Sequence, residues 1–277
     1  MIDLHLHTTA SDGRLSPERL VEEAAAAGVR TMAVTDHDTL AGVSAARAAC
    51  EAAHVAFIVG IEITAVHQGI DVHVLGYFLD EEDATLQAFL ATQRQDRRRR
   101  LAEMADRLAL AGAPVAIDAL LAQPASSGRA VGRPQLAAAL IEAGHARDVA
   151  DAFDRFLAPG RPGFASRRGA GPAEVVQLIA AAGGLASLAH PIKLPDQSLV
   201  GEMIAAGLPA IEVFHPDHDD DARGRYAALA SEHRLLVTGG SDFHGSAAGR
   251  ENHLGRVGLP DGELARLIAA KPARESR

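Results

Sequence analysis

The sequence predicts an α/β fold in which helices cover a mainly parallel sheet, as a closed barrel or as an open doubly wound sheet. Seven short apolar runs have the length and composition of buried strands. Most of them alternate with helical patterns, and this order places successive strands parallel to one another. With 277 residues, 48% of them apolar and 23% charged, the chain can bury a barrel-sized core, which excludes a disordered protein.

The predicted strands and helices follow one another in both halves of the chain. The strands are residues 2–6, 31–35, 56–62, 72–78, 185–189, 210–214 and 235–239. Helices are expected at residues 17–27, 40–53, 172–182, 197–206, 219–232 and 261–270. The first helix has a clear start, because Ser16 is a favoured cap and Pro17 suits the first turn. The link from Glu62 to Asp71 is too short for a crossover helix, so one irregularity is expected there.

The middle of the chain shows helical periods without any strand pattern. These periods cover residues 82–111, 115–122, 133–143 and 146–157. We therefore predict a helical insertion at residues 81–165, which caps the substrate site, within a domain formed by residues 1–80 and 166–277. The run Arg97 to Arg100 is interpreted as a solvated helical face rather than as an RNA contact.

Charge and cysteine content narrow the possible partners. The formal charge of −9 argues against binding of long duplex DNA, although it leaves small anionic substrates open. The single cysteine, Cys50, excludes a disulfide framework and a thiolate cluster, so any metal must use nitrogen and oxygen ligands. The sequence shows neither a signal peptide nor a membrane span. We expect a cytoplasmic protein with no membrane partner, and the oligomeric state stays open.

Metal-type side chains gather at the ends of the predicted strands. His5 and His7 are two residues apart and share one face at the end of the first strand, and Asp12 lies in the next loop. The other strands carry or lead into His37, Glu62, His73, His190, His215, Asp242 and His244. In parallel α/β folds ligands bind at the carboxyl ends of strands, which share one rim in a barrel. The pattern therefore predicts a single site.

A metal centre explains this pattern better than chance does. One histidine at a strand end is more often structural, but here a metal-type residue stands at nearly every strand end. Nitrogen and oxygen ligands suit Zn, Mn, Fe or Ni, and the number of ligands implies two or three divalent ions. Glu62 is the acid placed to bridge two of them. Histidines away from the rim are interpreted as surface residues: His54, His67, His145, His218 and His233.

Five motifs in order resemble those of the PHP (polymerase and histidinol phosphatase) family. They are His5-Leu6-His7-Thr8 with Ser11-Asp12-Gly13, Thr35-Asp36-His37-Asp38-Thr39, Gly60-Ile61-Glu62, Ala189-His190-Pro191 and Gly240-Ser241-Asp242-Phe243-His244. The resemblance implies a distorted (β/α)7 TIM-like barrel and metal-dependent phosphoesterase chemistry. The insertion is similar to that of the branch containing 3′,5′-nucleoside bisphosphate phosphatases, also described as 5′ to 3′ exoribonucleases on short RNA.

The resemblance also implies three metal positions. The first would be held by His5, His7, Glu62 and Asp242, the second by Glu62, His73 and His190, and the third by Asp12, His37 and His244. Mn²⁺ is the expected ion, with Zn²⁺ and Fe²⁺ as alternatives.

The expected reaction removes the 3′-phosphate of a nucleoside 3′,5′-bisphosphate, with short 5′-phosphorylated RNA as a further substrate. A metal-bridging hydroxide would attack phosphorus, and His215 is the candidate acid or phosphate contact. Arg133, Arg161 and Lys193 are candidates for substrate binding, since a guanidinium can take a terminal phosphate bidentately. The alternatives are a histidinol phosphate phosphatase and a non-catalytic nucleotide- or metal-binding protein.

Overall fold

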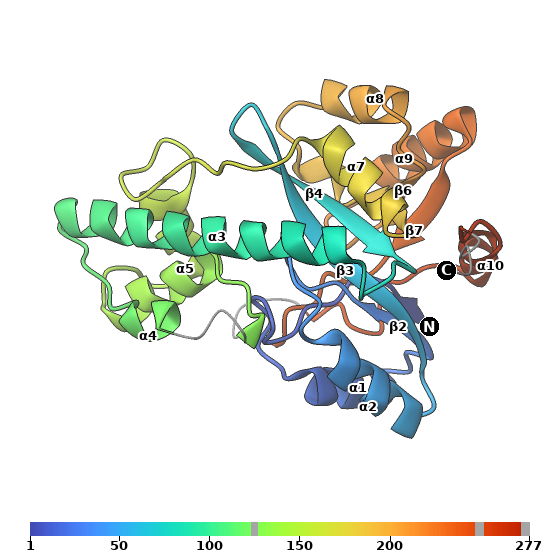
Figure 1. Ribbon diagram of the computed structural model, residues 1–277, viewed down its shortest axis with the longest axis horizontal. Coiled ribbons are helices and arrows are strands. Elements are labelled where there is room, and N and C mark those ends of the chain that lie inside the picture. Colours follow the sequence, from blue (N-terminus) through green and yellow to red (C-terminus); the bar gives the residue numbers. More distant parts are fainter. Residues whose placement is uncertain (123–126, 247–251, 273–277) are drawn as a thin grey trace.

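The computed structural model describes residues 1–122, 127–246 and 252–272, and its centre is a seven-stranded sheet (Figure 1). Each strand pairs with the next one in the chain. The first and last strands also meet, because Leu6 bridges to Phe243 and the Leu4 N–H donates to the Gly239 carbonyl over 3.2 Å. The result is a nearly closed barrel. Its strands are β1 (Ile2–Asp3), β2 (Thr31–Val34), β3 (Ala56–His67), β4 (Ile70–Tyr77), β5 (Leu185–Leu188), β6 (Ala210–Phe214) and β7 (Leu236–Gly239).

The irregularity expected between Glu62 and Asp71 is a β-hairpin. β3 and β4 pair antiparallel, from Gly60 opposite Tyr77 to His67 opposite Ile70, and β4 also pairs antiparallel with β5. The remaining strand pairs are parallel. β4 runs against the other strands, so its first half reaches the rim where the parallel strands end. The hairpin extends β3 five residues beyond the predicted strand 56–62.

Six helices surround the barrel close to the predicted ranges. They are α1 (Pro17–Ala26), α2 (Val43–Ala52), α7 (Pro172–Ala181), α8 (Ser198–Ala205), α9 (Asp220–His233) and α10 (Asp261–Ala269). The side chain of Ser16 caps α1 by accepting the N–H of Arg19. Each helix buries one apolar stripe, so the main core lies between the helices and the sheet, and its fully buried members include Ile63, Leu75 and Tyr77.

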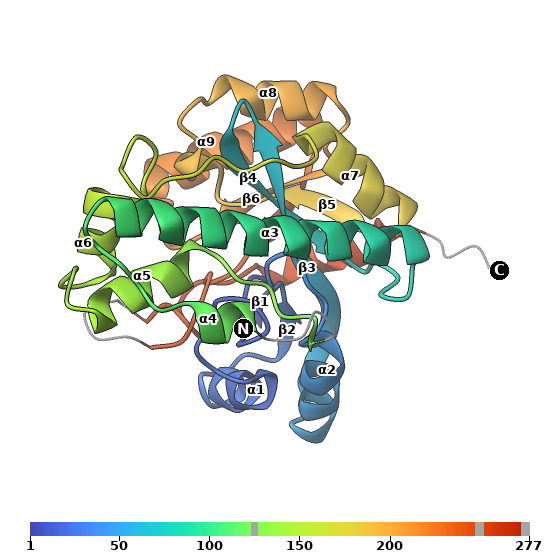
Figure 2. The same ribbon diagram turned by 60° about the vertical axis from the view of Figure 1, so that its left-hand side comes forward.

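Among the described residues, four helices and a π-helical turn lie between β4 and α7. They are α3 (Ala84–Leu110), α4 (Asp118–Leu121), α5 (Arg133–Glu142) and α6 (Val149–Ala152), which continues into the π-helix Phe153–Leu157. Leu86 and Leu90, near the start of α3, belong to the barrel core, whereas Leu101 and Met104 belong to a separate apolar cluster shared with α5 and the π-helix. α3 therefore connects two cores. It crosses the side of the barrel, and α4 and α5 lie beside the part of α3 that extends past the strands (Figures 1 and 2). The division at residues 81–165 stays a prediction.

Among the described residues, no helix combines the length and the apolar character needed to cross a bilayer. The cytoplasmic location expected from the sequence stays a prediction.

Candidate metal centre

The nine side chains that the sequence predicts as metal ligands meet at one end of the barrel. They follow β1, β2, β5 and β7 or lie within the β3–β4 hairpin: His5, His7, Asp12, His37, Glu62, His73, His190, Asp242 and His244. In four overlapping groups of three or four residues, the candidate ligand atoms lie within 4.8 Å of one another. The rim thus brings together residues up to 239 positions apart, from His5 to His244.

Glu62 stands at the middle of this centre with only 1% of its surface exposed. Its Oε2 lies 3.4 Å from His5 Nε2, 3.2 Å from His7 Nε2 and 3.1 Å from His37 Nδ1. Its Oε1 lies 2.9 Å from His73 Nδ1 and 3.1 Å from His190 Nε2. The two oxygens therefore face two different groups of rings, which is the arrangement that a bridging carboxylate requires.

Asp242, just after β7, faces two of these imidazoles, those of His5 and His7. Its Oδ1 lies 3.3 Å from both His5 Nε2 and His7 Nε2. Its Oδ2 lies 3.1 Å from Lys193 Nζ and 3.3 Å from His215 Nε2. Asp242 thus stands between other predicted ligands and Lys193 and His215, two of the four residues predicted to contact substrate.

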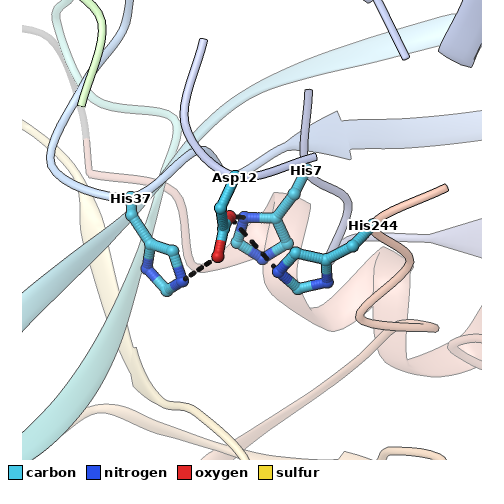
Figure 3. Close-up of side chains that lie close together, drawn as sticks. All are labelled: His7, Asp12, His37 and His244. Atoms are coloured by element: carbon cyan, nitrogen blue, oxygen red, sulfur yellow. Dashed lines mark ion pairs between the residues drawn. The ribbon is translucent and has the colours of Figure 1, made fainter. Parts of the chain in front are cut away.

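Asp12 lies among the rings of His7, His37 and His244 (Figure 3). Its Oδ1 lies 3.3 Å from His244 Nε2 and 3.7 Å from His7 Nδ1, and its Oδ2 lies 3.7 Å from His37 Nε2. The rings of His7 and His244 stack with their centroids 4.1 Å apart. Since His7 and His37 also face Glu62, the Asp12 group is continuous with the rest of the centre.

The donor atoms of this site fit divalent cations. Among the predicted ligands, five ring nitrogens are buried and make no well-oriented hydrogen bond to the described residues: His5 Nε2, both nitrogens of His7, His37 Nδ1 and His73 Nδ1. Leaving one such group unpaired costs about 1–3 kcal/mol, and so many at one place call for a ligand. Imidazole nitrogens and carboxylate oxygens are suitable ligands for Zn, Mn and Fe. Cations between the rings and the carboxylates would satisfy both.

The protonation of these rings depends on burial and on neighbouring charges. Burial lowers the pKa of His37 to about 3 and that of His190 to about 4, so both rings are neutral at pH 7. Burial also acts on His7, but Asp242 and Glu62 outweigh it and raise its pKa to about 10. Burial disfavours the ionised form of Glu62, yet the surrounding rings hold its pKa well below the usual value. Protons and cations therefore compete for these nitrogens.

Two further buried acids, which the sequence analysis did not assign, hold the loops of the centre. Asp36 accepts the Thr8 N–H over 2.7 Å and the hydroxyls of Thr8 and Ser11 over 2.6 Å. Asp3 accepts the backbone N–H of His5 over 3.3 Å and that of Ser241 over 2.9 Å. Asp36 thereby positions the turn that carries Asp12. Its place beside His37 was the only sequence signal for this role.

His215 and Lys193 lie beside the centre. His215 is 1% exposed, and its Nδ1 accepts the N–H of Asp217 over 3.0 Å. A neutral His215 ring therefore carries its proton on Nε2, the atom that faces Asp242. Lys193 Nζ lies 3.1 Å from carboxylate oxygens of both Asp217 and Asp242. His218, interpreted from the sequence as a surface residue, is instead buried, because the loop after β6 folds back and His218 Nδ1 contacts the Val213 carbonyl over 2.8 Å.

A second cluster of charged residues adjoins the centre where the insertion meets the barrel. A small cavity is lined by four arginines together with apolar and backbone groups: Arg97, Arg100, Leu101, Met104, Val131, Gly132, Arg133 and Arg167. The interpretation of Arg97 to Arg100 as a solvated face was wrong for Arg97 and Arg100, which are only 8% and 5% exposed. One buried stripe of α3 includes Gln93, Arg97, Arg100 and Met104. Their spacing of three or four residues is typical of a buried helix face, and it could have shown that Arg97 and Arg100 are buried.

Two acids pair with these arginines. Asp38 accepts from Arg97 Nε over 2.5 Å and from Arg167 over 3.1 Å. Asp71 accepts from Arg133 over 3.1 Å and lies 3.5 Å from Arg100. Asp38 directly follows His37 and Asp71 is two residues before His73, so the arginine cluster adjoins the predicted metal centre.

Arg161, the remaining substrate-binding candidate, lies on the surface of the insertion. Its side chain is 48% exposed and pairs with Asp154 over 2.9 Å. Its predicted role in substrate binding stays a prediction.

Comparison with known proteins agrees with this geometry. The PHP domain family matches residues 3–124. The 5′-3′ exoribonuclease Rnm of Escherichia coli is 36% identical over 249 residues, which cover 87% of this chain and 84% of that protein. The chain belongs to the PHP family. The family membership expected from the motifs is thereby confirmed, and it supports a hydrolase that acts on phosphate esters.

Other PHP relatives carry different activity names. The 3′,5′-nucleoside bisphosphate phosphatase of Chromobacterium violaceum is 32% identical over 253 residues, covering 90% of this chain and 88% of that protein. The phosphoribosyl 1,2-cyclic phosphate 1,2-diphosphodiesterase of Eggerthella lenta is 36% identical over 257 residues, covering 91% and 97%. A crystal structure described as a metal-dependent phosphoesterase from Bifidobacterium adolescentis superposes with a TM-score of 0.87 at 32% identity, over 99% of this chain and 97% of that one.

Proposed function

We propose that the protein is a metal-dependent phosphatase that removes the 3′-phosphate of nucleoside 3′,5′-bisphosphates, such as adenosine 3′,5′-bisphosphate. The products would be a nucleoside 5′-monophosphate and phosphate. Short 5′-phosphorylated RNA, shortened from its 5′ end, would be a second substrate. The observation that carries this proposal is the position of the arginine cluster directly beside the predicted metal centre.

The charge of the arginine cluster suits a phosphate dianion. Four guanidinium groups line the cavity and pair with two acids, Asp38 and Asp71, so two positive charges are left uncompensated within the cluster. Arginine binds phosphate through paired, charge-assisted hydrogen bonds. A substrate with two phosphates could therefore place one at the metal centre and the other at the arginines.

Within the cluster, Arg133 is the residue best placed to bind a phosphate. Arg97 already donates to Asp38, to Thr64 Oγ1 and to the Val131 carbonyl, which commits all of its nitrogens to the protein. Among the described residues, Arg133 makes a single hydrogen bond, from one terminal nitrogen to Asp71. It is also 25% exposed, so its guanidinium can be reached from outside.

The predicted ligands would hold two or three divalent ions, with Mn²⁺ as the expected metal. Glu62 would bridge, with His5, His7 and Asp242 on one side and His73 and His190 on the other. Asp12, His37 and His244 would form the third set. When bound, such ions lower the pKa of coordinated water and neutralise phosphoryl oxygens.

His215 and Lys193 would act on the reacting phosphate. The Nε2–H of His215 can donate to the leaving oxygen, which needs a proton as the ester bond breaks. Lys193 lies 41% exposed beside Asp242, where its ammonium can pair with a nonbridging phosphoryl oxygen. Both groups stand on the side of Asp242 that faces away from His5 and His7.

The experiment is a substrate panel with metal analysis of the purified protein. Phosphate release is measured with adenosine 3′,5′-bisphosphate, histidinol phosphate and phosphoribosyl 1,2-cyclic phosphate, and release of nucleoside 5′-monophosphate is measured with a 5′-phosphorylated dinucleotide. We expect the bisphosphate to be preferred, with activity lost to a chelator and restored by Mn²⁺. Preference for histidinol phosphate or the cyclic ester would replace the proposed substrate. Metal binding without turnover of any of the four would favour a binding protein.

A further inference from the structure

Glu212 is a buried carboxylate beneath the predicted metal centre that the proposed function leaves without a role. It lies in β6 and is 0% exposed. Its Oε1 lies 2.9 Å from His5 Nδ1, and its Oε2 accepts the backbone N–H of His190 over 2.7 Å. One carboxylate therefore contacts two predicted metal ligands, which lie 185 positions apart in the chain.

The contact with His5 determines which ring nitrogen faces the centre. A carboxylate oxygen can only accept, so His5 Nδ1 must carry a proton whenever this hydrogen bond forms. Nε2 is then the nitrogen with an available lone pair, and it lies 3.4 Å from Glu62 and 3.3 Å from Asp242. Hydrogen bonds of this kind fix the tautomer and the orientation of a histidine that ligates a metal.

The contact with His190 holds an uncommon backbone conformation. His190 has φ 27° and ψ 60°, a region that residues with a side chain seldom adopt. This turn directs the ring from the end of β5 to Glu62, where Nε2 lies 3.1 Å from Oε1. The short hydrogen bond from the His190 N–H to Glu212 stabilises the turn at the residue where the strain lies.

We propose that Glu212 is a positioning residue, which orients His5 and His190 together as ligands of adjacent metal positions. This role rests on the proposed metal centre but not on the identity of the substrate. Glu212 is not itself a ligand, because both of its oxygens are committed to His5 and His190.

The decisive variant is Glu212→Gln, which keeps the shape of the side chain. A glutamine has one acceptor oxygen, so it can serve His5 or His190 but not both. After removal of bound metal with a chelator, the protein is titrated with Mn²⁺ and free Mn²⁺ is followed by electron paramagnetic resonance. We expect the affinity for Mn²⁺ to fall ~10–100-fold. Wild-type affinity in the folded variant would overturn the proposal.

Ser187→Ala is the matched control, because it removes another buried hydrogen bond of the barrel interior, the 2.7 Å contact with Thr238. We expect it to keep the wild-type affinity for Mn²⁺. A loss of affinity equal to that of Glu212→Gln would show a general effect of disturbing the interior and would overturn the specific role.

A second measurement tests the proposal even if Glu212→Gln does not fold. In the wild-type protein loaded with diamagnetic Zn²⁺, ¹⁵N spectra of the histidine rings should show the proton of His5 on Nδ1, with the signal assigned through the His5→Gln variant. A proton on Nε2 would overturn the proposal. Failure to hydrolyse nucleoside bisphosphates would overturn the proposed substrate only, since both measurements are made without substrate.

Discussion

Single residues of the predicted metal centre have backbone conformations that cost folding energy. Asp38, His190 and Asp242 all have positive φ, at 52°, 27° and 49°. Such conformations cost about 1–3 kcal/mol each for residues other than glycine. The turns at His190 and Asp242 aim their side chains into the rim, and the turn at Asp38 aims its carboxylate into the adjoining arginine cluster.

His215 carries the first prediction at this scale. Removing a proton donor to the leaving oxygen typically slows a reaction by ~10²–10⁴-fold. We expect His215→Ala to lower kcat within this range, with a much smaller change in KM for adenosine 3′,5′-bisphosphate. His233→Ala, at an exposed histidine of α9, is the control and should leave both constants unchanged. Steady-state phosphate release checks this, and unchanged kcat and KM in His215→Ala would end the assignment.

Arg133 carries the second prediction. A hydrogen bond to a charged group contributes about 1.5–3 kcal/mol, so Arg133→Glu should raise KM for adenosine 3′,5′-bisphosphate by ~10–100-fold. The effect on adenosine 3′-phosphate, which lacks the 5′-phosphate, should be much smaller. The control is Arg99→Glu, at an exposed position of α3 where Arg99 pairs with Asp96. It should leave KM unchanged for both substrates. Equal effects of Arg133→Glu on both substrates would contradict phosphate binding at the arginine cluster.

At the scale of elements, Asp38 joins the helical insertion to the barrel. Arg97 from α3 and Arg167 from the segment before α7 both donate to it, and its Oδ1 accepts the Thr64 N–H over 2.8 Å. Burial disfavours the ionised form, but the two guanidiniums lower the pKa of Asp38 from 3.8 to about 2. The position of α3 against the rim therefore depends on this carboxylate being charged.

This junction predicts a pH dependence of stability. The pKa of Asp38 is depressed in the folded protein, so its contribution is present above pH 3.8 and is lost as the pH falls toward 2. The shift corresponds to about 2 kcal/mol. The free energy of unfolding of the metal-free protein is measured with urea. The difference in this free energy between wild type and Asp38→Asn should decrease by about 2 kcal/mol from pH 5 to pH 2. A gap independent of pH would contradict the ion pair.

At the scale of the whole molecule, the predicted metal centre joins strand ends from both halves of the chain. Cations held there would bind the folded barrel and not the unfolded chain, and a ligand at 100 times its Kd stabilises by about 2.7 kcal/mol. For a protein of this size we expect Mn²⁺ at that concentration to raise Tm by roughly 5–10 °C over chelator-treated protein.

Differential scanning calorimetry checks the change in Tm, with Glu62→Gln as the control. Removing the carboxylate that faces both groups of rings should abolish most of the shift. If Mn²⁺ left the Tm of the wild type unchanged, binding at a site formed by the folded barrel would be contradicted.

Much of the fold could be predicted because local patterns carry it. The spacing of apolar residues located each strand, and Ser16 with Pro17 marked the start of α1. The residues that gather at the rim could be identified from the sequence, because nearly all of them lie at or just after the end of a predicted strand. In a barrel of mainly parallel strands, these ends meet at one rim. The missed residues, such as Glu212 and Asp71, lie inside apolar or alternating strands, where an isolated acid carries no local signal of its partner.

The order of the amino acids is enough to specify the α/β pattern, the predicted rim ligands such as His5 and Glu62, and the excess of acids, since each is a local or compositional property. Packing in three dimensions decides the rest. It buried Arg97 and Arg100, which were expected on a solvated face, in a cluster beside Asp38 and Asp71, and it placed Glu212 under two predicted ligands. Both outcomes depend on contacts between segments far apart in the chain, which no local period records.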